Sequence, residues 1–138
     1  MGFPFRLLTP QGIAIQGEAN SVDLPTVDGP MTILPGYTNI IASLVKAGVL
    51  KVEIDAKPHY FAIFGGVVEM SKDHGCTVCV EEANDGYEID MARAIAARDR
   101  NLDLINNKVD GTDIIKAKAA LSKALARISA KELSQGKQ

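Results

Sequence analysis

The hydrophobic pattern of this chain changes period once, near residues 84–86, and that change limits what it can fold into. Before it, short apolar runs alternate with polar residues, as where Glu53 separates Val52 from Ile54. After it, apolar residues such as Met91 and Ile95 recur every three to four positions. Alternation is typical of strands, and the longer spacing is typical of amphipathic helices. We therefore expect a strand-rich part followed by a helical part.

The strand-rich part is predicted to be a β-sandwich domain over residues 1–85. Glycine and proline divide it into short extended runs with no helical pattern between them, which favours a sandwich or a barrel. We read Gly65-Gly66 as a turn or bulge between two strands, because no helix follows to make it a phosphate loop. The runs are Phe5–Leu8, Ile13–Gln16, Ser21–Leu24, Met31–Leu34, Asn39–Leu44, Val49–Ile54, Tyr60–Phe64, Val67–Met70 and Cys76–Glu81.

Residues 86–138 are predicted to form an antiparallel helical hairpin. The first helix is expected over residues 89–106, with a break over residues 109–112 before the second. Narrow, alanine-rich seams bury little apolar area, so the hairpin should be the labile part of the molecule. The expected seams are Met91, Ile95, Arg98, Leu102 and Ile105 in the first helix and Ile114, Ala117, Leu121, Leu125 and Ile128 in the second.

Charge is divided in the same way as the hydrophobic pattern. Residues 91–138 carry 10 Lys and Arg against 5 Asp and Glu, whereas residues 1–90 carry 5 against 12. A basic hairpin suits an acidic partner surface, and one alternative is a free-standing binding module that grips nucleic acid. The basic side chains have no aromatic neighbours for base stacking, so a solvated helix face also explains them. They include Arg98, Arg100, Lys116, Lys118 and Lys123.

The sequence contains no recognisable catalytic motif, so an enzyme is not expected and no metal or required cofactor is predicted. It lacks a nucleotide-binding Gly-x-x-x-x-Gly-Lys-Ser/Thr loop, and His59 and His74 have no metal-ligand spacing. Cys76 and Cys79 are three positions apart in an expected strand and should point to opposite faces. No apolar run approaches the roughly 18 residues of a membrane-spanning helix, and no export or lipid-anchor signal is expected.

Several strings, in this order, resemble the epsilon subunit family of the rotary ATP synthase, called delta in mitochondria. They are Gly29-Pro30-Met31-Thr32-Ile33-Leu34-Pro35-Gly36-Tyr37, Phe64-Gly65-Gly66-Val67-Val68-Glu69 and Ile89-Asp90-Met91-Ala92-Arg93-Ala94, preceded by Thr9-Pro10 and Gly17. The resemblance spans nearly the whole chain. The chain departs from the family at Pro30, where an acidic residue is common, and at Tyr37-Thr38-Asn39, in place of His-Ala-Pro.

The resemblance implies a non-catalytic rotor subunit in the central stalk of a proton-driven ATP synthase. Its sandwich would join the gamma subunit to the membrane ring of c subunits, and its hairpin would fold on the sandwich or extend into the alpha/beta catalytic head and restrain ATP hydrolysis. Such a subunit is peripheral on the inner, cytoplasmic membrane face, or lies in the thylakoid stroma or mitochondrial matrix if organellar. It does not span the membrane or bind nucleic acid.

The resemblance also implies a regulatory ATP site at Ile89, Asp90, Arg93 and Ala94, the start of the hairpin. Arg93 and Arg100 are seven residues apart, which places them on one helix face and suits phosphate binding. Arg127 on the facing helix adds a third positive group. The alternative is that Asp90 only favours the helix start and pairs with Arg93, with no ligand involved.

Overall fold

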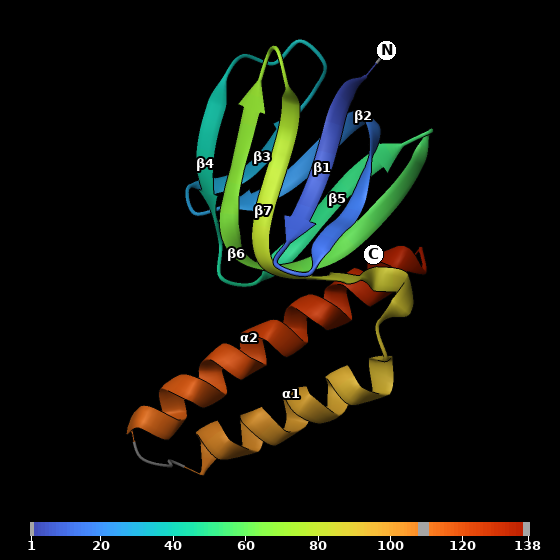
Figure 1. The fold of residues 1–138 in the computed structure, drawn as a ribbon. Coiled ribbons are helices and arrows are strands. Elements are labelled where there is room, and N and C mark those ends of the chain that lie inside the picture. The colour runs from blue at the N-terminus through green and yellow to red at the C-terminus, as the bar shows by residue number, and fades with distance from the viewer. Residues whose placement is uncertain (1, 108–110, 137–138) are drawn as a thin grey trace.

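The computed structural model describes residues 2–107 and 111–136, which form seven strands, one short 3-10 helix and two α-helices (Figure 1). In this part of the chain no helix combines the length and apolarity needed to cross a membrane. The strands are β1 (Phe3–Thr9), β2 (Gly12–Thr26), β3 (Gly29–Ile33), β4 (Ile40–Leu44), β5 (Gly48–Ile54), β6 (Lys57–Ser71) and β7 (Gly75–Asp85). The helices are η1 (Gly86–Glu88), α1 (Met91–Asn106) and α2 (Gly111–Ser134).

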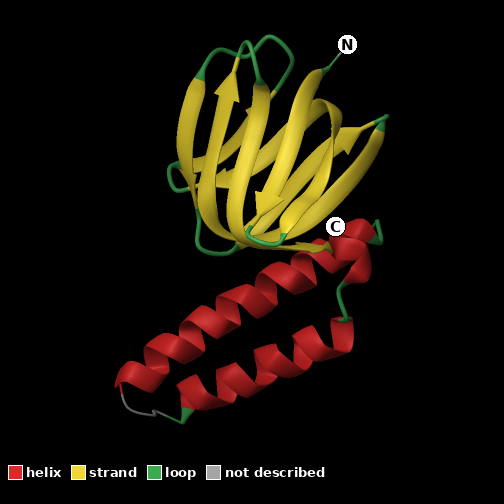
Figure 2. Cartoon of the chain, in the orientation of Figure 1, coloured by secondary structure: helices red, strands yellow, loops and turns green. Residues whose placement is uncertain are grey.

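The strands form the predicted β-sandwich, whose two layers are joined by two long strands (Figure 2). One layer contains β1, β7, β6 and β4, and the other contains β5, β2 and β3. β2 pairs first with β1 and then with β5 and β3, while β6 pairs first with β5 and then with β4. The core between the layers includes Phe5, Leu7, Val22, Leu50 and Val78, each at most 1% exposed. This core draws only on residues of the sandwich.

The nine predicted strands are seven in the described residues, because glycines expected to end strands lie inside them. Gly17 is paired with Phe5 in the middle of the β1–β2 ladder, so the two runs on either side of it form the single strand β2. Gly66 is paired with both Leu44 and Val80, so the runs around Gly65-Gly66 form the single strand β6. Ladder hydrogen bonds use only backbone atoms, which is why a glycine need not interrupt them.

Gly65 and Gly66 change which face of β6 is buried in the sandwich. Before them Phe61 and Ile63 lie in the core, and after them Val68 and Met70 do, so the alternation shifts by one residue. Both glycines have positive φ, 62° and 138°, which favours glycine. A Cβ on Gly66 would also collide with the backbone oxygen of Cys79. The result is that Phe64 leaves the sandwich core and faces the helices.

The two α-helices form the predicted antiparallel hairpin, and α2 lies between the sandwich and α1 (Figure 1). α2 contacts β5, β6, β7 and η1, whereas α1 packs mainly on α2. Phe64 and Ala62 of β6 pack in a second cluster against α2 residues such as Ala126 and Ala130. Gly86 lies so close to α2 that an added Cβ would stand 2.5 Å from the backbone oxygen of Ala130. Of the predicted break at residues 109–112, residues 109–110 lie outside the described residues, and α2 already begins at Gly111, earlier than predicted.

The buried face of the hairpin differs from the predicted seams. Leu125 is 45% exposed and Leu102 is 38% exposed, although both were expected to be buried. The buried positions of α2 include Ala124 and Ala130, because this helix packs against two partners and alanine allows both to approach closely. In α1 the amide of Asn101, 7% exposed, donates to the backbone oxygen of Ala97 at 2.7 Å, which satisfies a buried polar group.

Replacing Gly66 with Ala should destabilise the sandwich by at least about 2 kcal/mol, because the new methyl group meets strand β7 and the backbone is strained. Gly12→Ala is the matched control: Gly12 also has positive φ, 126°, but an added Cβ there meets nothing within 4 Å. Urea unfolding of both variants measures the difference. Equal losses of stability would show that backbone strain alone matters and that the contact with β7 does not.

Candidate functional site

A pocket of about 680 Å³ lies where the sandwich meets the hairpin. Its walls come from the end of β7, the segment between η1 and α1, one face of α1, and one residue of α2. All six residues predicted for a nucleotide site line it: Ile89, Asp90, Arg93, Ala94, Arg100 and Arg127. The structure therefore brings together residues that are up to 38 positions apart in the sequence.

Asp90 sets the start of α1 and with it the position of the arginines. Its backbone is extended, and its Oδ1 accepts a hydrogen bond of 3.2 Å from the backbone N–H of Arg93. This is an N-cap interaction, which satisfies one of the free amides at the helix end and typically contributes about 1 kcal/mol. Asp90 thus stabilises the start of α1, as the interpretation without a ligand predicted. Its side chain contacts the backbone N–H of Arg93, however, and not the Arg93 guanidinium.

Arg93 and Arg100 lie on the face of α1 that borders the pocket, as their spacing predicted. Both residues are exposed, and within the described chain neither guanidinium has a hydrogen bond or an ion pair. Ala96 and Ala97 border the pocket between them, so the wall there is small and uncharged. The two guanidinium groups are therefore available to an anion.

Ile89 and Ala94 form an apolar part of the pocket wall, at 8% and 5% exposure. Both also belong to the cluster that contains Phe64 and Ala62 of the sandwich. These two motif residues therefore have a packing role that does not depend on any ligand. They join the start of the hairpin to β6.

Arg127 is the only pocket arginine, among described residues, whose guanidinium is already engaged. Its Nη2 forms an ion pair of 3.0 Å with Oε2 of Glu82, and its Nε donates to Oδ1 of Asn84 at 2.9 Å. The guanidinium carbon also lies 4.9 Å from the centre of the Phe64 ring. Arg127 thus belongs both to the pocket and to the contact between α2 and the sandwich.

Three polar pocket residues were missed by the sequence analysis, namely Asn84, Asp85 and Glu88. The predicted last strand ended at Glu81, whereas β7 continues to Asp85 and carries Asn84 to the pocket edge. Asp85 caps η1, since its Oδ1 accepts from the backbone N–H of Tyr87 at 3.0 Å. The Asp-Gly pair at residues 85–86 is a turn signal and gave no indication of a binding site.

The pocket carries charge of both signs together with a small apolar surface. The basic groups are Arg93, Arg100 and Arg127, and the acidic groups are Asp85, Glu88 and Asp90. Guanidinium groups bind phosphate oxygens through paired charge-assisted hydrogen bonds. Such a lining can hold an anion beside a small apolar surface. Nothing in this arrangement resembles a nucleophile activated by a base.

Neither the histidines nor the cysteines belong to this pocket. His74 lines a second hollow of about 560 Å³ near the β6–β7 turn, together with Ile41 and Glu69. Cys76 is buried and Cys79 is exposed, which confirms that the two thiols lie on opposite faces of β7. Burial raises the pKa of the Cys76 thiol to about 12.

Two family models together match almost the whole chain. Residues 2–86 match the beta-sandwich domain of the ATP synthase delta/epsilon chain, and residues 88–132 match its long alpha-helix domain. The ATP synthase epsilon chain of Desulfitobacterium hafniense strain Y51 is 34% identical over 93% of this chain and 95% of its own length. That of Afipia carboxidovorans is 35% identical over 86% of both chains.

A solved structure has the same fold. A chain of the mitochondrial ATP synthase of Euglena gracilis, in a structure of its OSCP, F1 and c-ring, superposes with a TM-score of 0.81. The superposition covers 97% of this chain and 81% of that chain, at 20% sequence identity. At this identity the likeness concerns the arrangement of sandwich and hairpin and not individual contacts.

Proposed function

The chain belongs to the ATP synthase delta/epsilon family, and from this premise we propose that its sandwich docks on the gamma subunit and the c-ring while its hairpin regulates ATP hydrolysis. It is a non-catalytic subunit of the ATP synthase and part of a membrane-associated complex. The match of both family domains, in order, to nearly the whole chain is the observation that carries this function. It gives no support to the alternative of a nucleic-acid-binding module.

The outer face of the layer β1-β7-β6-β4 is the surface best suited to the gamma subunit. Ile41 is 77% exposed and Val67 is 46% exposed, and the pairing of β4 with β6 places both on this face. Val67 is also paired with Cys79 of β7. Exposed apolar side chains on neighbouring strands are typical of a protein contact. We name Ile41, Val67 and Cys79 the outer apolar strip.

The outer face of the other layer carries pairs of polar or charged groups. There Asp23 Oδ1 accepts from Thr32 Oγ1 at 2.7 Å, and Lys51 Nζ lies 5.9 Å from the ring centre of Tyr60. These groups are already paired with one another along the strands. The face of the outer apolar strip also carries polar groups, such as Arg6, which donates to Thr77 Oγ1 at 3.0 Å, so the exposed Ile41 and Val67 are what favour it as the gamma contact.

Assembly should protect Cys79 from alkylation if gamma covers the outer apolar strip. In the isolated protein a maleimide should label Cys79 and leave Cys76 unreacted, because Cys76 is buried and its raised pKa keeps it a thiol. In the assembled ATP synthase, labelling of Cys79 should fall by about tenfold or more, as expected for a side chain excluded from solvent at an interface.

The control is a Cys79→Ser/Lys57→Cys variant, which moves the exposed thiol to the start of β6. The new thiol should react equally before and after assembly. Undiminished labelling of Cys79 in the complex would place the gamma contact on another face.

The hairpin is suited to a regulatory role because none of its residues belongs to the sandwich core. That core contains no residue beyond Ala83, and α1 has little contact with the strands. The hairpin also carries most of the positive charge of the chain, which suits an acidic segment of the catalytic head. A basic arm of this kind can extend or fold back without unfolding the sandwich.

Cutting the chain after Asp85 should leave a folded sandwich that still assembles, while ATP hydrolysis by the complex rises or loses its latency. The measurement compares ATP-driven proton pumping and ATPase rate in membranes that carry the full chain or the truncated chain. A full chain with Lys116→Ala, an exposed position, controls for a change of hairpin charge. Failure of the truncated chain to assemble would show that the hairpin is needed for structure and not for regulation.

ATP is the ligand that we propose for the pocket between sandwich and hairpin. Arg93 and Arg100 provide two free guanidinium groups for its phosphates, and Ile89 and Ala94 provide an apolar wall for its base. Because the pocket includes residues of β7, α1 and α2, it exists only while the hairpin is folded. A ligand that binds only this state must favour it, so ATP should relieve inhibition of hydrolysis.

Arg93→Ala should weaken ATP binding by about 1.5–3 kcal/mol, the usual contribution of a charge-assisted hydrogen bond. Calorimetric titration of the isolated protein measures this directly. Arg98→Ala is the matched control, because Arg98 lies on the same helix, pairs with Asp99 and does not line the pocket. A wild-type protein that shows neither heat nor a thermal shift at millimolar ATP would leave Asp90 as a helix cap with no ligand role.

A further inference from the structure

Arg127 joins the hairpin to the sandwich through three partners on two strands. Phe64 lies on β6, and Glu82 and Asn84 lie on β7. The pairing of β6 with β7 sets Phe64 opposite Glu82 and Ala62 opposite Asn84, so these residues share one face of the sheet. This is the face that α2 covers. The sheet register therefore presents an aromatic ring, a carboxylate and an amide oxygen together to α2.

The guanidinium of Arg127 uses each of these groups in a different way. Its Nη2 is 3.0 Å from Oε2 of Glu82, and its Nε donates to Oδ1 of Asn84 at 2.9 Å. Its central carbon lies over the ring of Phe64, a residue only 2% exposed. A guanidinium can donate in its plane and stack on its face at the same time, which an ammonium cannot do.

The ion pair with Glu82 is special in its position. Of the two ion pairs in the described residues, it alone connects the hairpin to the sandwich, since the other joins Arg98 to Asp99 within α1. The Arg127 and Glu82 side chains are 30% and 44% exposed, so solvent weakens their attraction without removing it. Lys123, one turn earlier on α2, also lies over the Phe64 ring, at 5.5 Å.

We propose that Arg127 is a latch that holds the hairpin on the sandwich when no ligand is bound, with Phe64, Glu82 and Asn84 as its receptor on the sandwich. The arginines of the pocket then have two separate tasks. Arg127 is engaged with the sandwich, whereas Arg93 and Arg100 remain free for an anion. The latch does not depend on the proposed ATP site, because all its contacts are present in the chain alone.

Amide hydrogen exchange of the full-length protein, without nucleotide, tests the latch. In Arg127→Gln, amides in the second half of α2 should exchange at least about tenfold faster than in the wild type, because the charge and two hydrogen bonds are lost. Glu82→Gln should accelerate the same amides less, since its amide oxygen still accepts a hydrogen bond. Core strand amides, such as those of Leu50 and Val78, should be unchanged in both variants.

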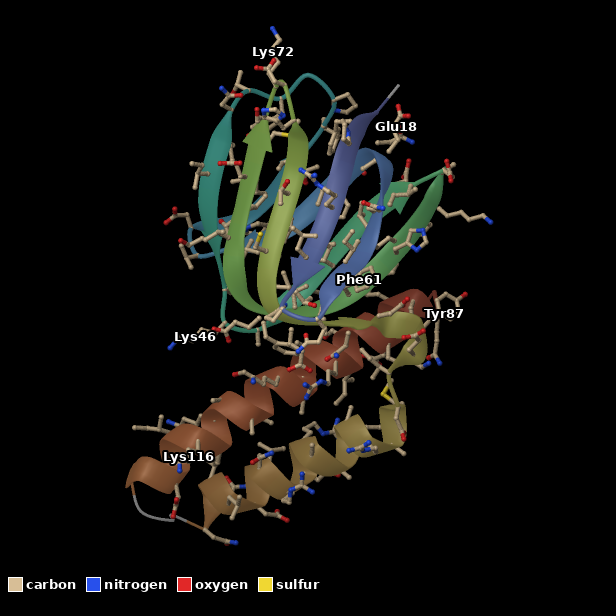
Figure 3. The ribbon with its side chains drawn as sticks, viewed as in Figure 1. Glu18, Lys46, Phe61, Lys72, Tyr87 and Lys116 are labelled. Atoms are coloured by element: carbon tan, nitrogen blue, oxygen red, sulfur yellow. The ribbon has the colours of Figure 1, made fainter. Side chains whose placement is uncertain are left out.

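Two controls make the result specific. Lys116→Ala removes a positive charge from the same helix at the end of the hairpin far from Tyr87 and η1 (Figure 3), and it should exchange like the wild type. If core strand amides also exchange faster in Glu82→Gln, then Glu82 stabilises β7 itself. The test of the latch then rests on Arg127→Gln, because this variant leaves the sandwich sequence unchanged. Unchanged α2 exchange in Arg127→Gln overturns the latch. The proposed ATP site is judged separately, by titration of the Arg93→Ala variant.

Discussion

The shift in alternation at Gly65 and Gly66 is the constraint on which the rest of the molecule depends. Before the shift the outward residues of β6 are Ala62 and Phe64, which pack against the helices. After the shift the outward residues are Val67 and Glu69, on the open face of the sandwich. The first half of β6 thus provides the surface on which the hairpin packs. The second half provides part of the outer apolar strip. A Cβ at Gly66 is excluded by the backbone of β7, so the shift needs glycine there.

This arrangement relates the two proposed roles of the chain to one another. The hairpin and the outer apolar strip are on different parts of the sandwich surface, so the proposed docking does not require the proposed movement of the helices to stop. The pocket, in contrast, is made by both parts and disappears when they separate. A ligand there would report on the position of the hairpin without any contact with the docking face.

Much of the fold follows from the sequence, because alternation and helical spacing report burial directly. The β-sandwich, the hairpin and the shared face of Arg93 and Arg100 were predicted in this way. The number of strands was not, because Gly17 was expected to end a strand and Gly65-Gly66 to form a turn or bulge between two strands, although backbone pairing continues through them. Leu125 was predicted to be buried, because the pattern of one helix does not reveal that α2 packs against both α1 and the sandwich. Glu82 and Asn84 were missed as receptors of Arg127 because their role depends on strand register.

Gly86 has a consequence for the hairpin movement that we propose. Its φ lies outside the left-handed region, so the backbone at this residue would accept any side chain when the arm is free. When the hairpin is docked, the backbone oxygen of Ala130 and the Cβ of Ser134 fill the space where a side chain on Gly86 would begin. A single methyl group at Gly86 would therefore oppose the docked position of the hairpin without straining the backbone itself.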